Sequence, residues 1–172
     1  ADATQLTRVA EIRERAGADT LAMATYRKAI ARNATPAATL ALTRLLEREG
    51  NAAEAAIAIE ALLGRARDDA SISDAVRRAL GLDEALGRLP DLAEALASDT
   101  DGGKVTPARR RALVDVLERL LPTLYRDPAS DQVRTHLGRI ALSPLLALVV
   151  ATDLPDPKAV EMLGMLGNAD AV

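Results

Sequence analysis

The sequence predicts an all-α fold in which antiparallel helical hairpins stack into an α-solenoid. Three observations carry this prediction. Helix start and stop signals are frequent, no stretch shows the sustained alternation of a strand, and a 33-residue spacing recurs within residues 1–69. The composition agrees, because 49% of the 172 residues are hydrophobic while only 1% are aromatic. A core of Leu, Val, Ile, Met and Ala favours closely packed helices.

Capping residues, prolines and glycines set the expected helix boundaries. Five dipeptides that mark helix starts are Thr35-Pro36, Thr106-Pro107, Asp127-Pro128, Ser143-Pro144 and Asp156-Pro157. The glycines that mark helix ends are Gly17, Gly50, Gly64, Gly81 and Gly167. The resulting helices span residues 3–16, 18–33, 36–49, 52–64, 70–80, 83–98, 107–125, 129–141, 144–151 and 157–166. Pro90 is expected to split the segment 83–98, and Pro122 to kink the end of the next helix.

These helices are expected to fall into four parts. Residues 1–69 hold two hairpins, 70–98 an irregular helical pair, 99–105 a linker, and 106–172 a further helical segment. The stretch SDTDGGKV at 98–105 is the expected internal boundary, since glycine and short polar residues gather there. The chain opens on alanine rather than methionine, which is consistent with a segment cut from a longer protein.

The repeat in residues 1–69 rests on matched positions 33 residues apart. The stretch RERAG at 13–17 is matched by LEREG at 46–50. The match extends through Val9 and Leu42, Ala22 and Ala55, Tyr26 and Ile59, and Ala29 and Leu62. Large positions stay large and small positions mostly stay small. Small residues therefore mark the close approach of two helices, and large residues fill the layer between hairpins.

This pattern resembles the tetratricopeptide repeat family. The positions of the first unit that match the family consensus are Leu6, Val9, Ala10, Gly17, Ala22, Tyr26 and Ala29. The second unit matches it through Leu42, Leu46, Gly50, Ala55, Ile59 and Leu62. The chain departs from the family at Arg13 and Thr39, where a large apolar or aromatic residue is expected, and both units lack the closing proline. The end of the chain, residues 156–172, faintly resembles a HEAT-type repeat.

The resemblance implies a groove that binds peptides, lined by the first helix of each hairpin. The residues that it places there are Thr7, Glu11, Glu14, Arg15, Leu40, Arg44, Glu47 and Arg48. Arg15 and Arg48, one repeat apart, are expected to grip the carboxylates of a partner, because guanidinium binds carboxylate in a bidentate way. The competing interpretation is that these Glu-Arg pairs are ordinary solvated charge on a helix face.

Signals for catalysis or metal binding are weak. The chain has no cysteine, and its single histidine, His136, has no partners at ligand spacing. The loop at 98–105 lacks the third oxygen ligand and closing glutamate of a calcium loop, and Val105 replaces the hydroxyl residue of a phosphate loop. We therefore expect neither an enzyme nor a bound cofactor or metal.

Nucleic acid is the second class of partner weighed. Arg109, Arg110 and Arg111 open a predicted helix, and Arg134 and Arg139 follow on the next. A helical-repeat module that grips nucleic-acid backbones is therefore the alternative function. The net charge of −3 and the shortage of aromatic residues argue against it, so the basic cluster is better explained by nearby acidic residues.

The expected function is a non-catalytic scaffold or adaptor that binds another protein or peptide. The apolar stretch 144–150 and the helix 157–166 offer a second surface, for self-association, although burial in the chain's own core is expected for most of their residues. The run 141–151 is too short to span a bilayer and contains Ser143-Pro144, so no membrane contact is expected. The expected location is cytoplasmic, with export as the alternative if a signal peptide preceded Ala1.

Overall fold

A computed structural model describes residues 1–33, 35–65, 69–98, 106–150 and 156–167. The described residues form nine α-helices and one short 3-10 helix, and none of them lies in a strand. The predicted all-α class is therefore confirmed. The chain divides into two compact units, Ala1–Leu62 and Leu63–Val172, which are taken in turn.

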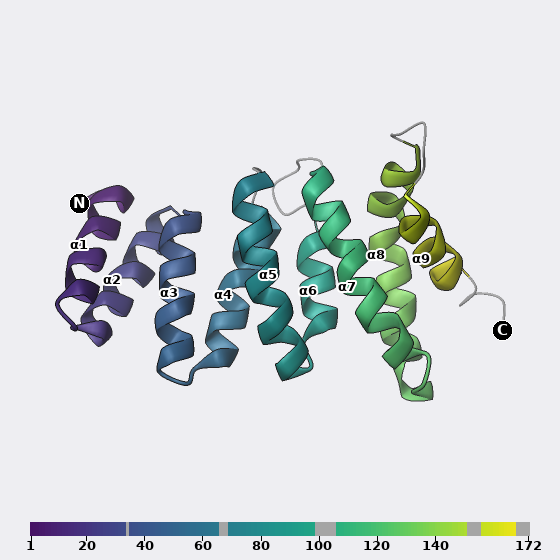
Figure 1. The fold of residues 1–172 in the computed structure, drawn as a ribbon, viewed down its shortest axis with the longest axis horizontal. Helices are drawn as coiled ribbons and strands as arrows, with labels where there is room; N and C mark the ends of the chain where they lie inside the picture. Colours follow the sequence, from purple (N-terminus) through teal and green to yellow (C-terminus); the bar gives the residue numbers. More distant parts are fainter. Residues whose placement is uncertain (34, 66–68, 99–105, 151–155, 168–172) are drawn as a thin grey trace. The chain divides into compact units, whose positions relative to one another are not determined.

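The first unit is built from two pairs of helices (Figure 1). Their bounds are α1 Ala3–Arg15, α2 Asp19–Arg32, α3 Pro36–Arg48 and α4 Ala52–Arg65, of which the end of α4 passes into the second unit. Helix α2 packs against both α1 and α3. The first two helices have 13 and 14 residues, and so do the next two. Every bound recurs after 33 residues, which confirms the period read from the sequence.

Both turns of the repeat have the same geometry. Gly17 and Gly50 have φ angles of +73° and +78°, a region that favours glycine because it has no Cβ. The N–H of Gly17 donates to Glu14 O, and the next N–H, of Ala18, donates to Arg13 O. Gly50 and Asn51 bond in the same way to the last turn of α3. This is the Schellman pattern, and it ends both helices at equivalent residues.

The core of the first unit follows the repeat closely in α2 and α4, but not at every matched position of α1 and α3. Ala22, Ala55, Tyr26 and Ile59 are all fully buried at matched positions. Val9 was predicted to fill the layer between hairpins, but it is 40% exposed whereas its counterpart is 4% exposed. The reason is that no described helix of the first unit covers this side of α1.

Ala22→Leu is expected to lower the free energy of unfolding by about 1–3 kcal/mol, because it adds volume at a fully buried position of α2. Ala24→Leu, at an exposed position of the same helix, is the matched control and should change stability by less than about 0.5 kcal/mol. Denaturant unfolding of both variants measures the difference. Equal stabilities would show that Ala22 does not occupy a tight contact.

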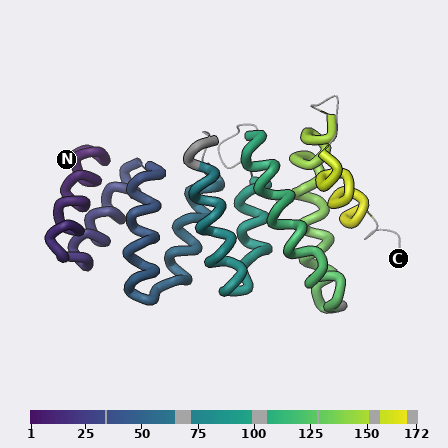
Figure 2. The backbone as a smooth tube through the Cα atoms, viewed as in Figure 1, coloured from purple at the N-terminus to yellow at the C-terminus, as the bar shows by residue number. Residues whose placement is uncertain are grey.

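The second unit is organised around one central helix (Figure 2). Its helices are α5 Asp69–Leu86, α6 Leu89–Ala97, α7 Pro107–Leu124, the 3-10 helix η1 Pro128–Ser130, α8 Asp131–Val150 and α9 Pro157–Gly167. Helix α7 packs against α5, α6, α8 and α9, and it buries residues on every turn from Ala112 to Leu124. Its N-cap is Thr106, whose side chain accepts from Arg109 N–H, as the Thr-Pro signal predicted.

Gly81 and Ser143-Pro144 do not mark helix boundaries in the second unit, whereas the split expected near Pro90 is present. Gly81 does not end a helix, and α5 continues to Leu86, where Gly87 adopts a φ of +69° and Arg88 N–H bonds back to Asp83 O. The split expected at Pro90 falls just before Leu89, so Pro90 lies in the first turn of α6. Ser143-Pro144 does not start a helix either, because α8 runs through it without a break.

The division between the two compact units falls at Leu62–Leu63, within α4. The predicted internal boundary at 98–105 stays a prediction. The helices on either side of that stretch, α6 and α7, pack directly against each other. Residues 99–105 lie outside the described residues.

The apolar C-terminal helices are buried only in part. Leu145, Leu148 and Met162 are buried, as expected for most of these residues. Three side chains one turn apart on α8 are exposed instead, namely Leu142, Leu146 and Val150. They leave a surface for the predicted self-association, which stays a prediction.

The length and composition of helix α8 bear on membrane contact. In the described part of the chain it is the helix long and apolar enough to span a bilayer by length and composition alone, and 28% of its most apolar stretch is buried. The apolar run that begins at residue 141 is part of a longer helix than its sequence predicted, because α8 continues through Pro144 to Val150. A single helix of this kind is weak grounds for a span, since core helices of soluble proteins meet the same criteria.

Candidate functional site

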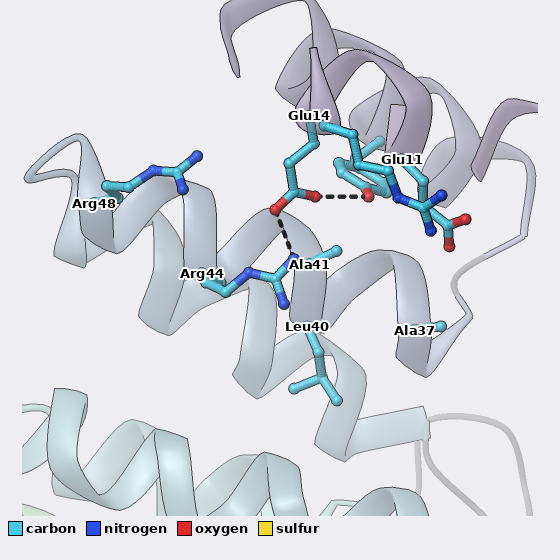
Figure 3. A pocket seen from close by; sticks show the side chains of 9 residues that line it. Glu11, Glu14, Ala37, Leu40, Ala41, Arg44 and Arg48 are labelled. Atoms are coloured by element: carbon cyan, nitrogen blue, oxygen red, sulfur yellow. Dashed lines mark hydrogen bonds and ion pairs between the residues drawn. The ribbon is translucent and has the colours of Figure 1, made fainter. Parts of the chain in front are cut away.

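A pocket of about 560 Å³ lies on the first unit, between α1 and α3 (Figure 3). Its lining residues are Glu11, Glu14 and Arg15 from α1, Tyr26 from α2, and Ala37, Leu40, Ala41, Arg44 and Arg48 from α3. Six of the eight groove residues expected from the sequence are among them. The other two, Thr7 and Glu47, do not line it, and the Thr7 hydroxyl donates to Ala3 O within its own helix.

The centre of the pocket is held by an interaction across three helices. Glu14 accepts a hydrogen bond from the Tyr26 hydroxyl at 3.1 Å and pairs with the Arg44 guanidinium at 2.7 Å. Figure 3 shows Glu14 reaching from α1 toward Arg44 on α3. The Glu14 side chain is only 17% exposed, whereas that of Arg44 is 54% exposed. This carboxylate therefore ties α1 to α2 and α3 and fixes one guanidinium at the pocket.

Tyr26 supplies the buried end of this interaction. Its side chain is fully buried, and burial raises the pKa of its hydroxyl above the usual value near 10. The hydrogen bond to Glu14 and the negative charge of that carboxylate raise the pKa further. Both effects favour the neutral phenol, which is the form that can donate to Glu14.

Arg48 is engaged by the protein itself. Its guanidinium pairs with the Asp19 carboxylate at 2.6 Å. Asp19 is the first residue of α2, where a negative charge also interacts favourably with the helix dipole. This pair argues against the predicted binding of a partner's carboxylates by both Arg15 and Arg48, because the Arg48 guanidinium already pairs with a carboxylate of the protein.

Glu11 and Arg15 are the two other charged residues that line the pocket. Neither forms a hydrogen bond or an ion pair through its side chain with any other described residue. They lie four positions apart on α1, so both face the same side of the helix. The pocket thus offers one carboxylate and one guanidinium to an incoming molecule.

Four residues of the site were missed in the sequence. Ala37 and Ala41 lie seven and three positions before Arg44, and helical periodicity on α3 could have found them. Tyr26 was assigned to the core alone, although its hydroxyl reaches the pocket. The sequence did not indicate a role for Asp19 at the pocket, because its ion pair with Arg48 depends on how α2 and α3 pack.

The arginines proposed for nucleic acid are largely occupied. Arg109 is buried, and its guanidinium donates to Ala95 O at 2.8 Å and to Ser98 O. Arg134 pairs with Asp131 and stacks over the Tyr125 ring at 5.0 Å. The side chains of Arg110 and Arg111 are half-buried and exposed, respectively.

His136 lies among charged residues of the second unit. Its Nε2 atom is 3.6 Å from Glu94 Oε2, and its Nδ1 atom is 3.2 Å from an Arg139 nitrogen. Arg139 and Arg134 also line a smaller pocket of about 240 Å³ between α8 and α9. Among the described residues, no group of three histidine or acidic side chains is arranged to hold a metal ion.

Comparisons with protein-family models, with curated proteins and with solved structures find no match for this chain. The resemblance to tetratricopeptide repeats therefore stays a prediction, which rests on the residues quoted above and on the 33-residue spacing of the helices.

Proposed function

We propose that the chain is a non-catalytic interaction module, a scaffold or adaptor, that binds a peptide segment of another protein in the pocket between α1 and α3. In this proposal the two hairpins are tetratricopeptide-like and belong to a solenoid. The observation that carries the proposal is the pocket itself: six of the eight residues that the family resemblance implied for a groove line one concavity.

The chemistry of the pocket suits a peptide. Ala37, Leu40 and Ala41 form an apolar strip along α3, flanked by charged side chains from both helices. Interfaces of this kind gain affinity from an apolar anchor and specificity from the surrounding polar groups. Because the central Glu14 is already held by Tyr26 and Arg44, the pocket is formed before a ligand arrives.

Leu40→Lys is expected to reduce peptide affinity at least tenfold, because it places a charge in the apolar strip. The probe is a peptide enriched from a displayed random library against the full chain, and titration calorimetry measures its affinity for each variant. Leu21→Lys is the matched control: Leu21 is an exposed leucine of the same unit outside the pocket, and its replacement should change affinity less than twofold. Equal binding to both variants would contradict the proposal.

The alternative is a module that grips nucleic-acid backbones through Arg109, Arg110, Arg111, Arg134 and Arg139. Its signature would be binding whose affinity falls steeply with salt. The structure favours the peptide proposal, because Arg109 and Arg134 already engage groups of the protein.

A further inference from the structure

The charges that line the pocket are not equivalent. Arg44 and Arg48 each pair with a carboxylate of the protein, at 2.7 Å and 2.6 Å. Glu14 is satisfied twice, by Arg44 and by Tyr26. A ligand that used any of these three groups would have to break an existing interaction, so these charges shape the pocket more than they attract a ligand.

Glu11 and Arg15 remain for recognition. They have opposite charges, and their Cβ atoms are about 6 Å apart, as expected for positions i and i+4 of a helix. Neither side chain has a hydrogen-bond or ion-pair partner among the described residues, so a ligand can contact both without breaking an interaction of the protein. The apolar strip with Leu40 lies on the facing helix, so one ligand can contact the strip and both charges.

We propose that the partner segment carries one acidic and one basic side chain on the same face, so that the acidic group meets Arg15 and the basic group meets Glu11. This inference rests on the proposed function and names its partner: a segment of mixed charge rather than an acidic one. An extended segment presents such a pair at positions i and i+2, about 6.6 Å apart. A helical segment presents it at positions i and i+4, at about 6 Å.

Mixed charge follows from the position of Glu11. A segment with acidic groups alone would place a carboxylate within about one helical turn of this uncompensated carboxylate. Like charges at that distance repel each other, and the repulsion would offset part of the attraction to Arg15. A basic group beside the acidic one turns the same carboxylate into a second favourable contact.

Charge reversal at each residue tests the pairing independently of the direction in which the peptide runs. Random peptides are displayed and selected against the full chain with its native sequence, and against Glu11→Arg and Arg15→Glu. Peptides are kept when Leu40→Lys abolishes their binding, which restricts the set to the pocket. Lys28→Glu is the matched control, since Lys28 is an exposed cation of α2 outside the pocket.

We expect the native chain and Lys28→Glu to enrich peptides with one acidic and one basic residue at the stated spacing. Glu11→Arg should enrich two acidic residues, and Arg15→Glu two basic residues. Neutralising either charge in a native-selected peptide should weaken binding about fivefold in calorimetry. Peptides that depend on Leu40 but show the same pattern with all variants, or no charged pair, would overturn this inference and leave the proposed function standing. An absence of peptides that depend on Leu40 would overturn both.

Discussion

Arg109→Met is expected to lower the free energy of unfolding by about 2–4 kcal/mol. The Arg109 guanidinium is buried at the N-terminal end of α7 and donates to Ala95 O and Ser98 O. These carbonyls belong to the end of α6, where the last carbonyls of a helix have no partner within it. A cation at that end also interacts favourably with the helix dipole. Methionine keeps an apolar stem of similar length and removes both bonds, and charged hydrogen bonds contribute about 1.5–3 kcal/mol each.

Two further variants make this result specific. Arg111→Met removes an exposed arginine two positions along the same helix, and it should change stability by less than about 0.5 kcal/mol. Arg109→Lys should recover part of the loss, because an ammonium group supplies charge without the planar fork of donors. Denaturant unfolding of the three variants measures these differences. If Arg109→Met and Arg111→Met were equally stable, Arg109 would not join α6 to α7.

Helix ends in the first unit could be predicted because local signals and tertiary packing agree there. Gly17 and Gly50 follow amphipathic stretches, adopt positive φ and form the same pair of backbone bonds. Thr35 caps α3 just ahead of Pro36, as its sequence indicates. Each of these signals depends on residues within about one helical turn, which is why a single sequence was sufficient.

The errors in the second unit arise where tertiary packing overrides a local signal. Gly81 has the same sequence context as a helix end, but α5 continues past it to Leu86, and Glu84 in this last part pairs with Arg119 of α7 at 2.8 Å. Pro144 lacks an N–H and removes one bond from α8, yet it is buried beside Ala141 and Leu145. Packing of this face stabilises the helix enough to offset the missing bond. Neither outcome is visible in the flanking residues alone.

The candidate site shows the same limit. The resemblance to tetratricopeptide repeats implied that Glu14, Arg15, Arg44 and Arg48 share one surface, and all four line the pocket. It could not assign their partners. Arg44 pairs with a residue 30 positions earlier, and Arg48 with Asp19, 29 positions earlier. Such choices depend on the offset between neighbouring helices, and they decide which charges remain for a ligand.

Glu14→Ala is expected to lower the free energy of unfolding by about 2–3 kcal/mol. The largest part comes from the buried Tyr26 hydroxyl, which loses a charged acceptor, and such a bond contributes about 1.5–3 kcal/mol. The pair with Arg44 adds less, because the guanidinium is half exposed and solvent screens it. Glu49→Ala, at an exposed carboxylate beside the C-terminal end of α3, is the control and should leave stability nearly unchanged. In a double-mutant cycle, Tyr26→Phe should remove most of the effect of Glu14→Ala.

The pH dependence of the free energy of unfolding tests the same hydrogen bond, because it reports when the Tyr26 hydroxyl loses its proton. The folded pKa of Tyr26 is raised above its usual value near 10, first by burial and then by Glu14. Its contribution to stability is therefore fully present below pH 10. Above that pH the unfolded chain loses the tyrosine proton while the folded chain keeps it, so stability falls, by at most about 1.4 kcal/mol per pH unit.

The native chain should lose stability relative to Tyr26→Phe between pH 9 and 11, as measured by denaturant unfolding. In Glu14→Ala this loss should be smaller but still present, because burial remains. A stability difference between the native chain and Tyr26→Phe that stays constant over this range would show that the hydroxyl is not held in the buried, hydrogen-bonded state described here.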